Sequence, residues 1–210
     1  MDIPINPNEY FHGYENEVSA DDFMSFVRHP FNRNKKFEFI DGRIVLMAGN
    51  ASINHQIITG YLFAEIRNHL EGQKCEVFFD LNLLLYKKEL GKCQNIYQPD
   101  VMVNCDRSQK IKNHIEGVPE FVAEVISAST ASYDYNEKRE NYIKYGVKEL
   151  WLIDLSKDRV TVFINKATGD PSIFKYTFVD EVKLDTFPGL TIDFGKILKK
   201  VDKSELDWTK

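Results

Sequence analysis

The sequence has few cysteines and no apolar run long enough to cross a membrane. Its three cysteines, Cys75, Cys93 and Cys105, form no CxxC pair and lack the spacing of a zinc site. An odd number without such motifs favours reduced thiols, so we expect a cytoplasmic protein. The short apolar runs exclude a membrane-spanning helix, and the opening residues MDIPINPNEYFHGYENE lack the basic start and apolar core of a signal peptide.

A surplus of positive charge is also absent, because 27 Lys and Arg face 32 Asp and Glu and give a net charge of −5. This balance counts against a protein that coats nucleic acid electrostatically. It does not exclude an enzyme that binds nucleic acid locally through a metal ion and a few lysines. Basic clusters occur at Lys35-Lys36, Lys87-Lys88 and Arg107 to Lys112, and each alone is more typical of a solvated loop.

The chain has 210 residues, 43% of them hydrophobic, which suits one domain with a sizeable core. It contains no repeat, low-complexity segment or internal linker. Residues 1–18 are polar, so we expect a loose N-terminal arm there and a single domain over residues 19–210.

Helix signals occur at several places along the chain. Ser19 and Asp22 form a capping-box pattern before a short helix. Ser52 can cap a helix over residues 53–70, whose apolar spacing is helical. A further helix is expected over residues 134–145, with a glycine as its C-terminal stop.

Strand signals fill most of the remaining sequence. The run KFEFIDGRIVLM predicts a hairpin, because Asp41-Gly42 tolerates the positive φ of a tight turn. Further strands are expected at 74–86, 97–105, FVAEVIS, ELWLID, RVTVFI, SIFKYTFV and EVKLD, with a polar loop at 106–117 and a closing helix in DFGKILKKV. This order predicts an α/β fold in which helices flank a mixed β-sheet.

Glu124 lies within the apolar stretch FVAEVIS, which is expected to be a buried strand. Burying an unpaired carboxylate is costly, so such a group usually pairs, protonates or binds a metal ion. Side chains alternate along strands, so Asp100 shares a face with Met102, and Glu124 shares one with Val122. If these two strands pair, Asp100 and Glu124 converge, and two carboxylates at one point repel unless a cation lies between them.

A hard dication such as Mg²⁺ prefers oxygen ligands of this kind, keeps several waters and commonly binds substrate phosphate. It activates water as a nucleophile and offsets charge that develops on phosphate oxygens. Lys138 lies near the start of the helix that follows Glu124, where it can contribute a cation for the phosphate. The residues therefore indicate a metal-dependent phosphodiesterase.

An ordered set of motifs strengthens this interpretation. The pattern PD, E-V-x-S-x-S-T, D-x-x-x-K-x-x-x-Y and G-V-x-E-x-W-x-x-D resembles the Uma-two (Uma2) family of restriction-type endonucleases in the PD-(D/E)XK nuclease superfamily. The matching residues are Pro99-Asp100, Glu124-Val125, Ser127, Ser129-Thr130, Asp134, Lys138, Tyr142, Gly146-Val147, Glu149, Trp151 and Asp154. FEFIDGRIVLM, followed by His55 at the start of a helix, also fits, so the resemblance covers most of the domain.

The resemblance implies a restriction-endonuclease-like fold with Asp100 and Glu124 as ligands of Mg²⁺ or Mn²⁺. It implies that Lys138 is catalytic and that Glu38 and His55 support the site. The superfamily usually places a lysine two residues after the acidic residue, where this chain has Ile126. The resemblance therefore implies that the lysine has moved to the helix as Lys138.

Each candidate also has a purely structural interpretation. Asp100 can end a turn after a proline. Lys138 can form an i,i+4 pair with Asp134 on a solvated helix face, and Asp134 can simply cap that helix. By strand alternation Glu38 points away from its phenylalanine neighbours and can face solvent, and a structural role is the commoner one for a histidine such as His55.

The combined prediction is a divalent-metal-dependent endonuclease whose substrate is nucleic acid, most simply DNA. A homodimer is expected, because double-strand cleavage by a single-site enzyme suits two copies. One alternative is a catalytically silent scaffold that binds nucleic acid or protein, which the acidic net charge and Ile126 favour. Another is a metal-dependent hydrolase of small phosphates.

Overall fold

The computed structural model of the chain describes residues 19–32, 35–47, 51–87, 95–127, 131–203 and 206. The first sheet contains, in spatial order, β2 (Arg43–Leu46), β1 (Phe37–Ile40), β5 (Asn95–Tyr97), β4 (Asn82–Leu85), β8 (His114–Gly117) and β7 (Lys110–Ile111). The second contains β12 (Ser172–Tyr176), β11 (Arg159–Ile164), β10 (Glu149–Asp154), β9 (Phe121–Val125), β6 (Val101–Asn104) and β3 (Glu76–Phe78). A separate ribbon pairs β13 (Glu181–Lys183) with β14 (Thr191–Asp193).

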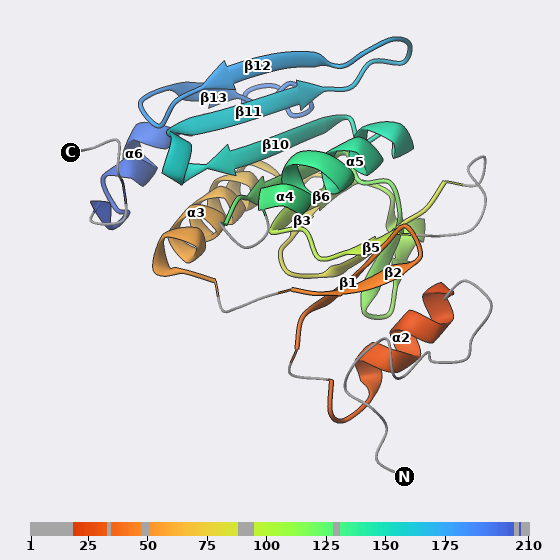
Figure 1. Cartoon of the computed structure of the whole chain (residues 1–210). Coiled ribbons are helices and arrows are strands. Elements are labelled where there is room, and N and C mark those ends of the chain that lie inside the picture. Colours follow the sequence, from red (N-terminus) through yellow and green to blue (C-terminus); the bar gives the residue numbers. More distant parts are fainter. Residues whose placement is uncertain are drawn as a thin grey trace.

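Each large sheet is mixed, because β4 and β8 run parallel in the first and β9 and β10 run parallel in the second. The helical segments are α2 (Ala20–Arg28), α3 (Ile53–His69), α4 (Ala131–Tyr133), the π-helical η3 (Asp134–Lys138), α5 (Arg139–Tyr145), α6 (Phe194–Leu198) and the 3-10 turns η2 (Arg107–Gln109) and η4 (Leu155–Lys157). Figure 1 shows α2 at one end of the molecule, beside β1, and β12 at the other. The predicted α/β architecture with a mixed sheet and flanking helices is confirmed, although the strands are shared between two large sheets.

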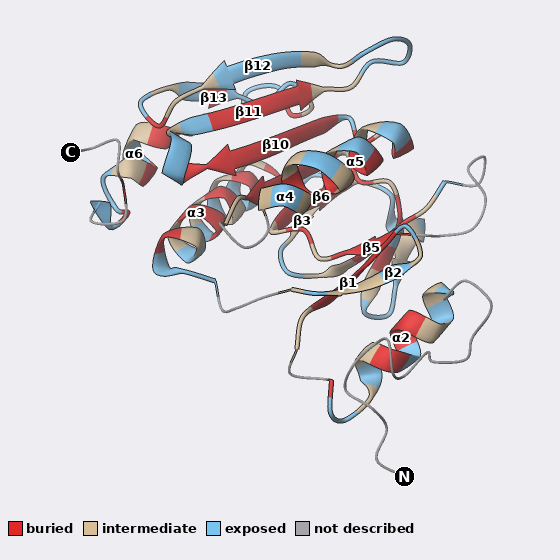
Figure 2. Cartoon of the chain, viewed as in Figure 1, coloured by how far each residue is buried: buried red, intermediate tan, exposed pale blue. Residues whose placement is uncertain are grey.

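The buried residues, red in Figure 2, belong to successive layers of the molecule. On one face of the second sheet, α3 and α6 pack through residues such as Ile58 against Val101. On its other face, Met102 packs in a second cluster with side chains of the first sheet and with Tyr142 of α5. Phe26 of α2 belongs to a third cluster on the outer face of the first sheet. The two sheets and α5 therefore meet at one buried junction.

The local signals in the sequence are realised as expected. The Ser19 hydroxyl accepts a hydrogen bond from the Asp22 N–H, and the capping box is complete. The Ser52 hydroxyl accepts a hydrogen bond from the backbone N–H of the third residue of α3. At the β1–β2 turn, Asp41 and Gly42 have φ values of 46° and 79°, as a two-residue hairpin of matching twist requires.

Two predicted long strands are each divided. The stretch 74–86 forms β3 in the second sheet and β4 in the first, and the stretch around 97–105 forms β5 in the first and β6 in the second. The chain crosses between sheets at the same place in both cases, where the Asp80 N–H donates to the Pro99 carbonyl at 3.2 Å. Asp80 has a φ of 48°, so the chain turns sharply there. The stretch 106–117, expected to be a polar loop, contains β7 and β8.

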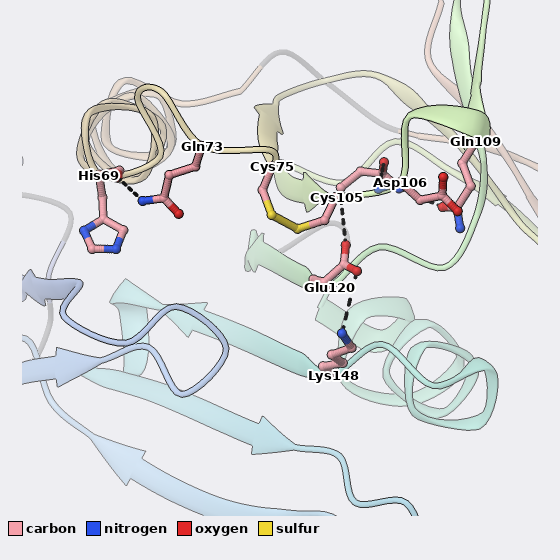
Figure 3. Close-up of a disulfide and its surroundings, with 9 residues drawn as sticks. His69, Gln73, Cys75, Cys105, Asp106, Gln109, Glu120 and Lys148 are labelled. Atoms are coloured by element: carbon pink, nitrogen blue, oxygen red, sulfur yellow. Dashed lines mark hydrogen bonds and ion pairs between the residues drawn. A yellow bond between two sulfur atoms is a disulfide. The ribbon is translucent and has the colours of Figure 1, made fainter.

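The expectation of reduced thiols is wrong for two of the cysteines. Cys75 and Cys105 form a disulfide whose Cα atoms are 4.0 Å apart (Figure 3). They face each other because Glu76 pairs with Asn104 in the antiparallel β3–β6 ladder, which places the adjoining cysteines side by side. The backbone N–H of Cys105 also donates to Oε2 of Glu120 at 2.8 Å. Cys93 lies outside the described residues.

Within the described ranges, no helix combines the length and the apolar character needed to cross a bilayer. The arm expected at residues 1–18 lies outside these ranges, so the domain boundary at residue 19 stays a prediction.

Candidate active site

The predicted pairing of the strands beside Asp100 and Glu124 is present. In the antiparallel β6–β9 ladder, Val101 lies opposite Ala123 and Met102 opposite Val122. The same register places Asp100 opposite Glu124 at the end of the ladder. The two carboxylates also interact electrostatically, because the charge of Asp100 is among those that raise the pKa of Glu124.

Asp100 is anchored by two donors. Its Oδ2 accepts a hydrogen bond of 2.7 Å from the Val125 N–H and lies 3.1 Å from Nε2 of His55. Burial alone would raise the pKa of Asp100, but the hydrogen bond and charge of His55, the Val125 N–H and the charge of Lys36 together lower it. Asp100 is therefore held in its ionised form, which is the form that binds a cation.

Glu124 lies deeper, with 3% of its surface exposed. Its Oε1 accepts a hydrogen bond of 2.7 Å from the Tyr142 hydroxyl and lies 3.5 Å from Nζ of Lys138. Burial, together with the charges of Asp100, Asp134 and Glu38, raises the pKa of Glu124 to about 8 against the opposing effect of Lys138. This carboxyl group is thus poised to change its charge near neutral pH.

Lys138 is enclosed by carboxylates from three elements. Its Nζ lies 3.0 Å from Oε1 of Glu38, 3.1 Å from Oδ1 of Asp134 and 3.5 Å from Oε1 of Glu124. Burial alone would lower the pKa of Lys138, but the three carboxylates outweigh it and raise that pKa well above its ordinary value. Lys138 is therefore a permanent cation and cannot serve as a general base near neutral pH.

The helix that carries Lys138 differs from the prediction. It begins at Ala131, so Asp134 lies inside it and does not cap it. Asp134 and Lys138 lie in the π-helical segment η3, and both are buried. The predicted i,i+4 pair exists, but it lies at the sheet junction and not on a solvated face. Short π-helical segments often occur at functional sites, where they redirect side chains.

Glu38 is fully buried, so the alternative that it faces solvent is wrong. Alternation along β1 does turn it away from the phenylalanines, as expected, but both faces of the first sheet are covered. The phenylalanines pack with α2, and Glu38 faces the junction with the second sheet. Besides Lys138, its Oε1 accepts a hydrogen bond of 3.1 Å from the Gln98 N–H, two residues before Asp100.

Sequence reasoning missed part of the polar network around the lysine. The Asn141 amide donates to the Tyr97 hydroxyl at 3.0 Å, and that hydroxyl donates to Oδ1 of Asn95 at 3.0 Å. Nζ of Lys138 lies 5.8 Å from the centre of the Tyr97 ring. The spacing of Asn141 and Tyr142, three and four residues after Lys138, is the sequence signal that could have indicated a shared helix face.

The donors present suit a hard dication with few protein ligands. Among the described residues, no three His, Cys, Asp or Glu side chains lie together as a complete ligand set. Within the same residues, the hydrogen bonds and ion pairs of Asp100 and Glu124 use Oδ2 and Oε1, which leaves Oδ1 and Oε2 to bind a cation. Oε2 of Glu38 is buried there without a hydrogen-bond partner. Two carboxylates are a sufficient protein contribution for Mg²⁺, which keeps several waters.

Comparison with a solved structure defines the class of protein. The chain is similar to a crystal structure titled as a "putative nuclease belonging to DUF820" from Anabaena variabilis ATCC 29413, with a TM-score of 0.62 and 18% identity over 78% of this chain and 89% of that one. At this identity the likeness establishes the fold alone. The fold is that of the restriction-endonuclease-like α/β proteins, and it carries two adjoining carboxylates and a buried lysine.

Comparison of sequences gives the family. A family model described as "Putative restriction endonuclease" matches residues 23–195, and the chain belongs to this family, Uma2. It is also similar to two proteins of Synechocystis sp. (strain ATCC 27184 / PCC 6803 / Kazusa). Uncharacterized protein slr1290 is 29% identical over 80% of this chain and 85% of its own length. Uncharacterized protein sll1609 is 34% identical over 54% of this chain and 62% of its own length. The Ser129-Thr130 part of the family motif lies outside the described residues.

Proposed function

We propose that this Uma2 protein is an endonuclease that hydrolyses phosphodiester bonds in DNA and depends on Mg²⁺ or Mn²⁺ held by Asp100 and Glu124. The observation that carries the proposal is the β6–β9 register, which sets these two carboxylates opposite each other at the end of the ladder. Among the described residues, the hydrogen bonds and ion pairs of each carboxylate use one oxygen, Oδ2 of Asp100 and Oε1 of Glu124. A bound dication supplies charge neutralisation at phosphate oxygens and acidifies water near phosphorus.

The surrounding residues prepare this pair for the reaction. His55 holds Oδ2 of Asp100 in place, so that Oδ1 would be the oxygen available to a cation. The Tyr142 hydroxyl occupies Oε1 of Glu124 in the same way, so that Oε2 would be available to a cation. Residues that orient ligands in this way raise metal affinity and fix geometry.

Lys138 supplies a fixed positive charge beside the reacting phosphate. Its Nζ lies near three carboxylates, and the contact with Glu124, at 3.5 Å, is the longest. Glu38 and Asp134 keep the ammonium in place. With substrate bound, this charge would stabilise a phosphate oxygen or orient the attacking water.

The burial of Lys138 also favours a second function, that of a catalytically silent binding protein. Lys138 has 3% of its surface exposed and is surrounded by acidic partners, so it can be a structural counter-ion in a catalytically silent scaffold. In that case the protein binds nucleic acid or protein without cleaving it. Fold alone does not decide between the two, because function depends on the site.

Plasmid DNA incubated with Mg²⁺ or Mn²⁺ distinguishes the two functions. We expect wild-type protein to nick or linearise the plasmid and Glu124→Gln to lose that activity. Glu149→Gln is the matched control, because Glu149 is also buried, on the neighbouring strand β10, and among the described residues its carboxylate accepts from Trp151 and the Thr186 N–H. Cleavage that persists in Glu124→Gln would refute the mechanism. Cross-linking in the same preparation tests the predicted homodimer.

A further inference from the structure

An exposed aromatic side chain lies at the turn between β3 and β4. Phe79 has 57% of its surface exposed, although it directly follows a strand whose residues are half buried. Its ring packs edge-on against Phe63 of α3, with the ring centres 4.8 Å apart and the planes at 76°. Phe63 therefore supports one side of the ring and leaves the rest open to solvent.

The turn that carries this ring lies beside the strand end at Asp100. Phe78 pairs with Met102 in the β3–β6 ladder, so Phe79 follows at the level of Val101. The hydrogen bond of 3.2 Å from the Asp80 N–H to the Pro99 carbonyl fixes the turn next to Asp100. The turn that carries Phe79 and the strand end that carries Asp100 are consequently held together by backbone contacts.

Lys36 lies next to the turn that carries Phe79 and Asp80. Nζ of Lys36 lies 3.1 Å from Oδ1 of Asp80, and the two side chains are 36% and 67% exposed. Through Asp80, Lys36 is tied to the turn whose backbone N–H bonds to the Pro99 carbonyl, one residue before Asp100. Exposed ion pairs of this kind contribute little free energy, so Lys36 can exchange Asp80 for another anion at small cost.

We propose that Phe79 and Lys36 form a subsite for an unstacked nucleobase and its adjoining phosphate, immediately beside the phosphodiester bond at Asp100. The inference rests on the proposed function and narrows its substrate to nucleic acid with a base available for stacking. Every nucleobase has a flat apolar face, so stacking on Phe79 tolerates any sequence. An intact duplex keeps its bases stacked, and this subsite therefore favours single strands or an everted nucleotide.

One residue of this surface, Asp80, disfavours phosphate binding. The Asp80 carboxylate repels a phosphate and competes for Lys36. Replacing Asp80 with Asn removes the charge and keeps a residue that tolerates the positive φ at this position. We therefore expect Asp80→Asn to bind nucleic acid more tightly than the wild type does, by about threefold.

Fluorescence anisotropy with labelled oligonucleotides tests the subsite. The probes are single-stranded DNA, single-stranded RNA of the same sequence, a fully abasic strand and the blunt duplex, with Ca²⁺ in place of Mg²⁺ to limit cleavage. Phe79→Ala should weaken binding of the single strands by about tenfold, and Phe79→Trp should restore it. Neither change should alter binding of the abasic strand or the duplex. Lys36→Met should reduce the slope of log affinity against log salt by about 0.7 for single strands.

Phe174→Ala is the matched control, because Phe174 is 47% exposed on β12, at the opposite edge of the same sheet. Equal single-strand affinities for wild type and Phe79→Ala, or an equal loss in Phe174→Ala, would overturn the subsite while leaving plasmid cleavage as evidence for the nuclease. Phe79-dependent binding without any cleavage would support the subsite and count against the catalytic proposal. A wild-type protein that binds none of the probes would overturn both.

Discussion

The Tyr142 hydroxyl donates a hydrogen bond of 2.7 Å to Oε1 of Glu124, across the junction of α5 and the second sheet. Both groups are buried, so water does not compete with the contact. The bond holds Oε1 of Glu124 against the helix. Metal affinity and stability should therefore both depend on a residue that does not itself touch the metal ion.

Tyr142→Phe should lower the free energy of unfolding by about 1–3 kcal/mol, because a buried acceptor loses its donor. It should also weaken Mn²⁺ binding by about tenfold, since the ligand is no longer oriented. Tyr97→Phe is a suitable control: that hydroxyl bonds to asparagines, so stability should fall without a change in Mn²⁺ affinity. Urea denaturation and calorimetric titration measure the two effects, and unchanged Mn²⁺ affinity in Tyr142→Phe would count against the orienting role.

The raised pKa of Glu124 predicts how stability depends on pH. Its pKa is about 8 in the folded protein and near 4.5 ordinarily, so between these values the folded state holds a proton that the unfolded state has released. The folded state then binds more protons, and this contribution to stability falls as pH rises through that window. Glu124→Gln has no such proton, so its stability relative to wild type should improve from pH 5 to pH 8. Parallel stability curves for the two proteins would refute the assigned pKa.

The buried ammonium of Lys138 should be the largest single contributor to stability in the site. Lys138→Met leaves three carboxyl groups without their cation and should cost about 3–5 kcal/mol. Adding Glu38→Gln should recover part of that loss, because one of the uncompensated charges is removed. Lys196→Met removes an exposed pair with Asp193 and should change stability by less than about 1 kcal/mol. Strict additivity of the Lys138 and Glu38 changes in chemical denaturation would contradict the ion network.

The disulfide between Cys75 and Cys105 makes a separate prediction. It closes a loop over a sequence separation of 30, so reduction should lower the free energy of unfolding by about 3–4 kcal/mol. Thiol titration of the oxidised, denatured protein should detect Cys93 alone. Cys93→Ser should lose as much stability on reduction as the wild type does, because it keeps the Cys75–Cys105 bond. Three reactive thiols before reduction would show that the bond does not form.

Local features of this fold could be predicted from the sequence because neighbouring residues determine them. The caps at Ser19 and Ser52 and the turn at Asp41-Gly42 depend on side chains and φ values within a few residues. The divided strands could not be predicted in this way. Apolar residues resume directly after Asp80 and after Pro99-Asp100, so each stretch was interpreted as one strand. The presence of a second sheet explains why the chain turns there.

In the candidate site, too, part of the arrangement could be predicted from the sequence and part could not. Strand alternation brought Asp100 and Glu124 together correctly, because the β6–β9 register preserves it. Asp134 was interpreted as a cap because its spacing from Glu137 fits a capping box, and that pattern does not exclude a helix that begins earlier, at Ala131. The Cys75–Cys105 pair was missed because a disulfide across two strands depends on their register and leaves no characteristic spacing in the sequence.

Calorimetric titration of Mn²⁺ into wild type, Asp100→Asn and Glu124→Gln at pH 8 tests most directly whether two facing acidic side chains share one ion. We expect a single site in the wild type and its loss in each variant, with both variants still folded by circular dichroism. Retention of the wild-type affinity and stoichiometry by either folded variant would contradict the shared site.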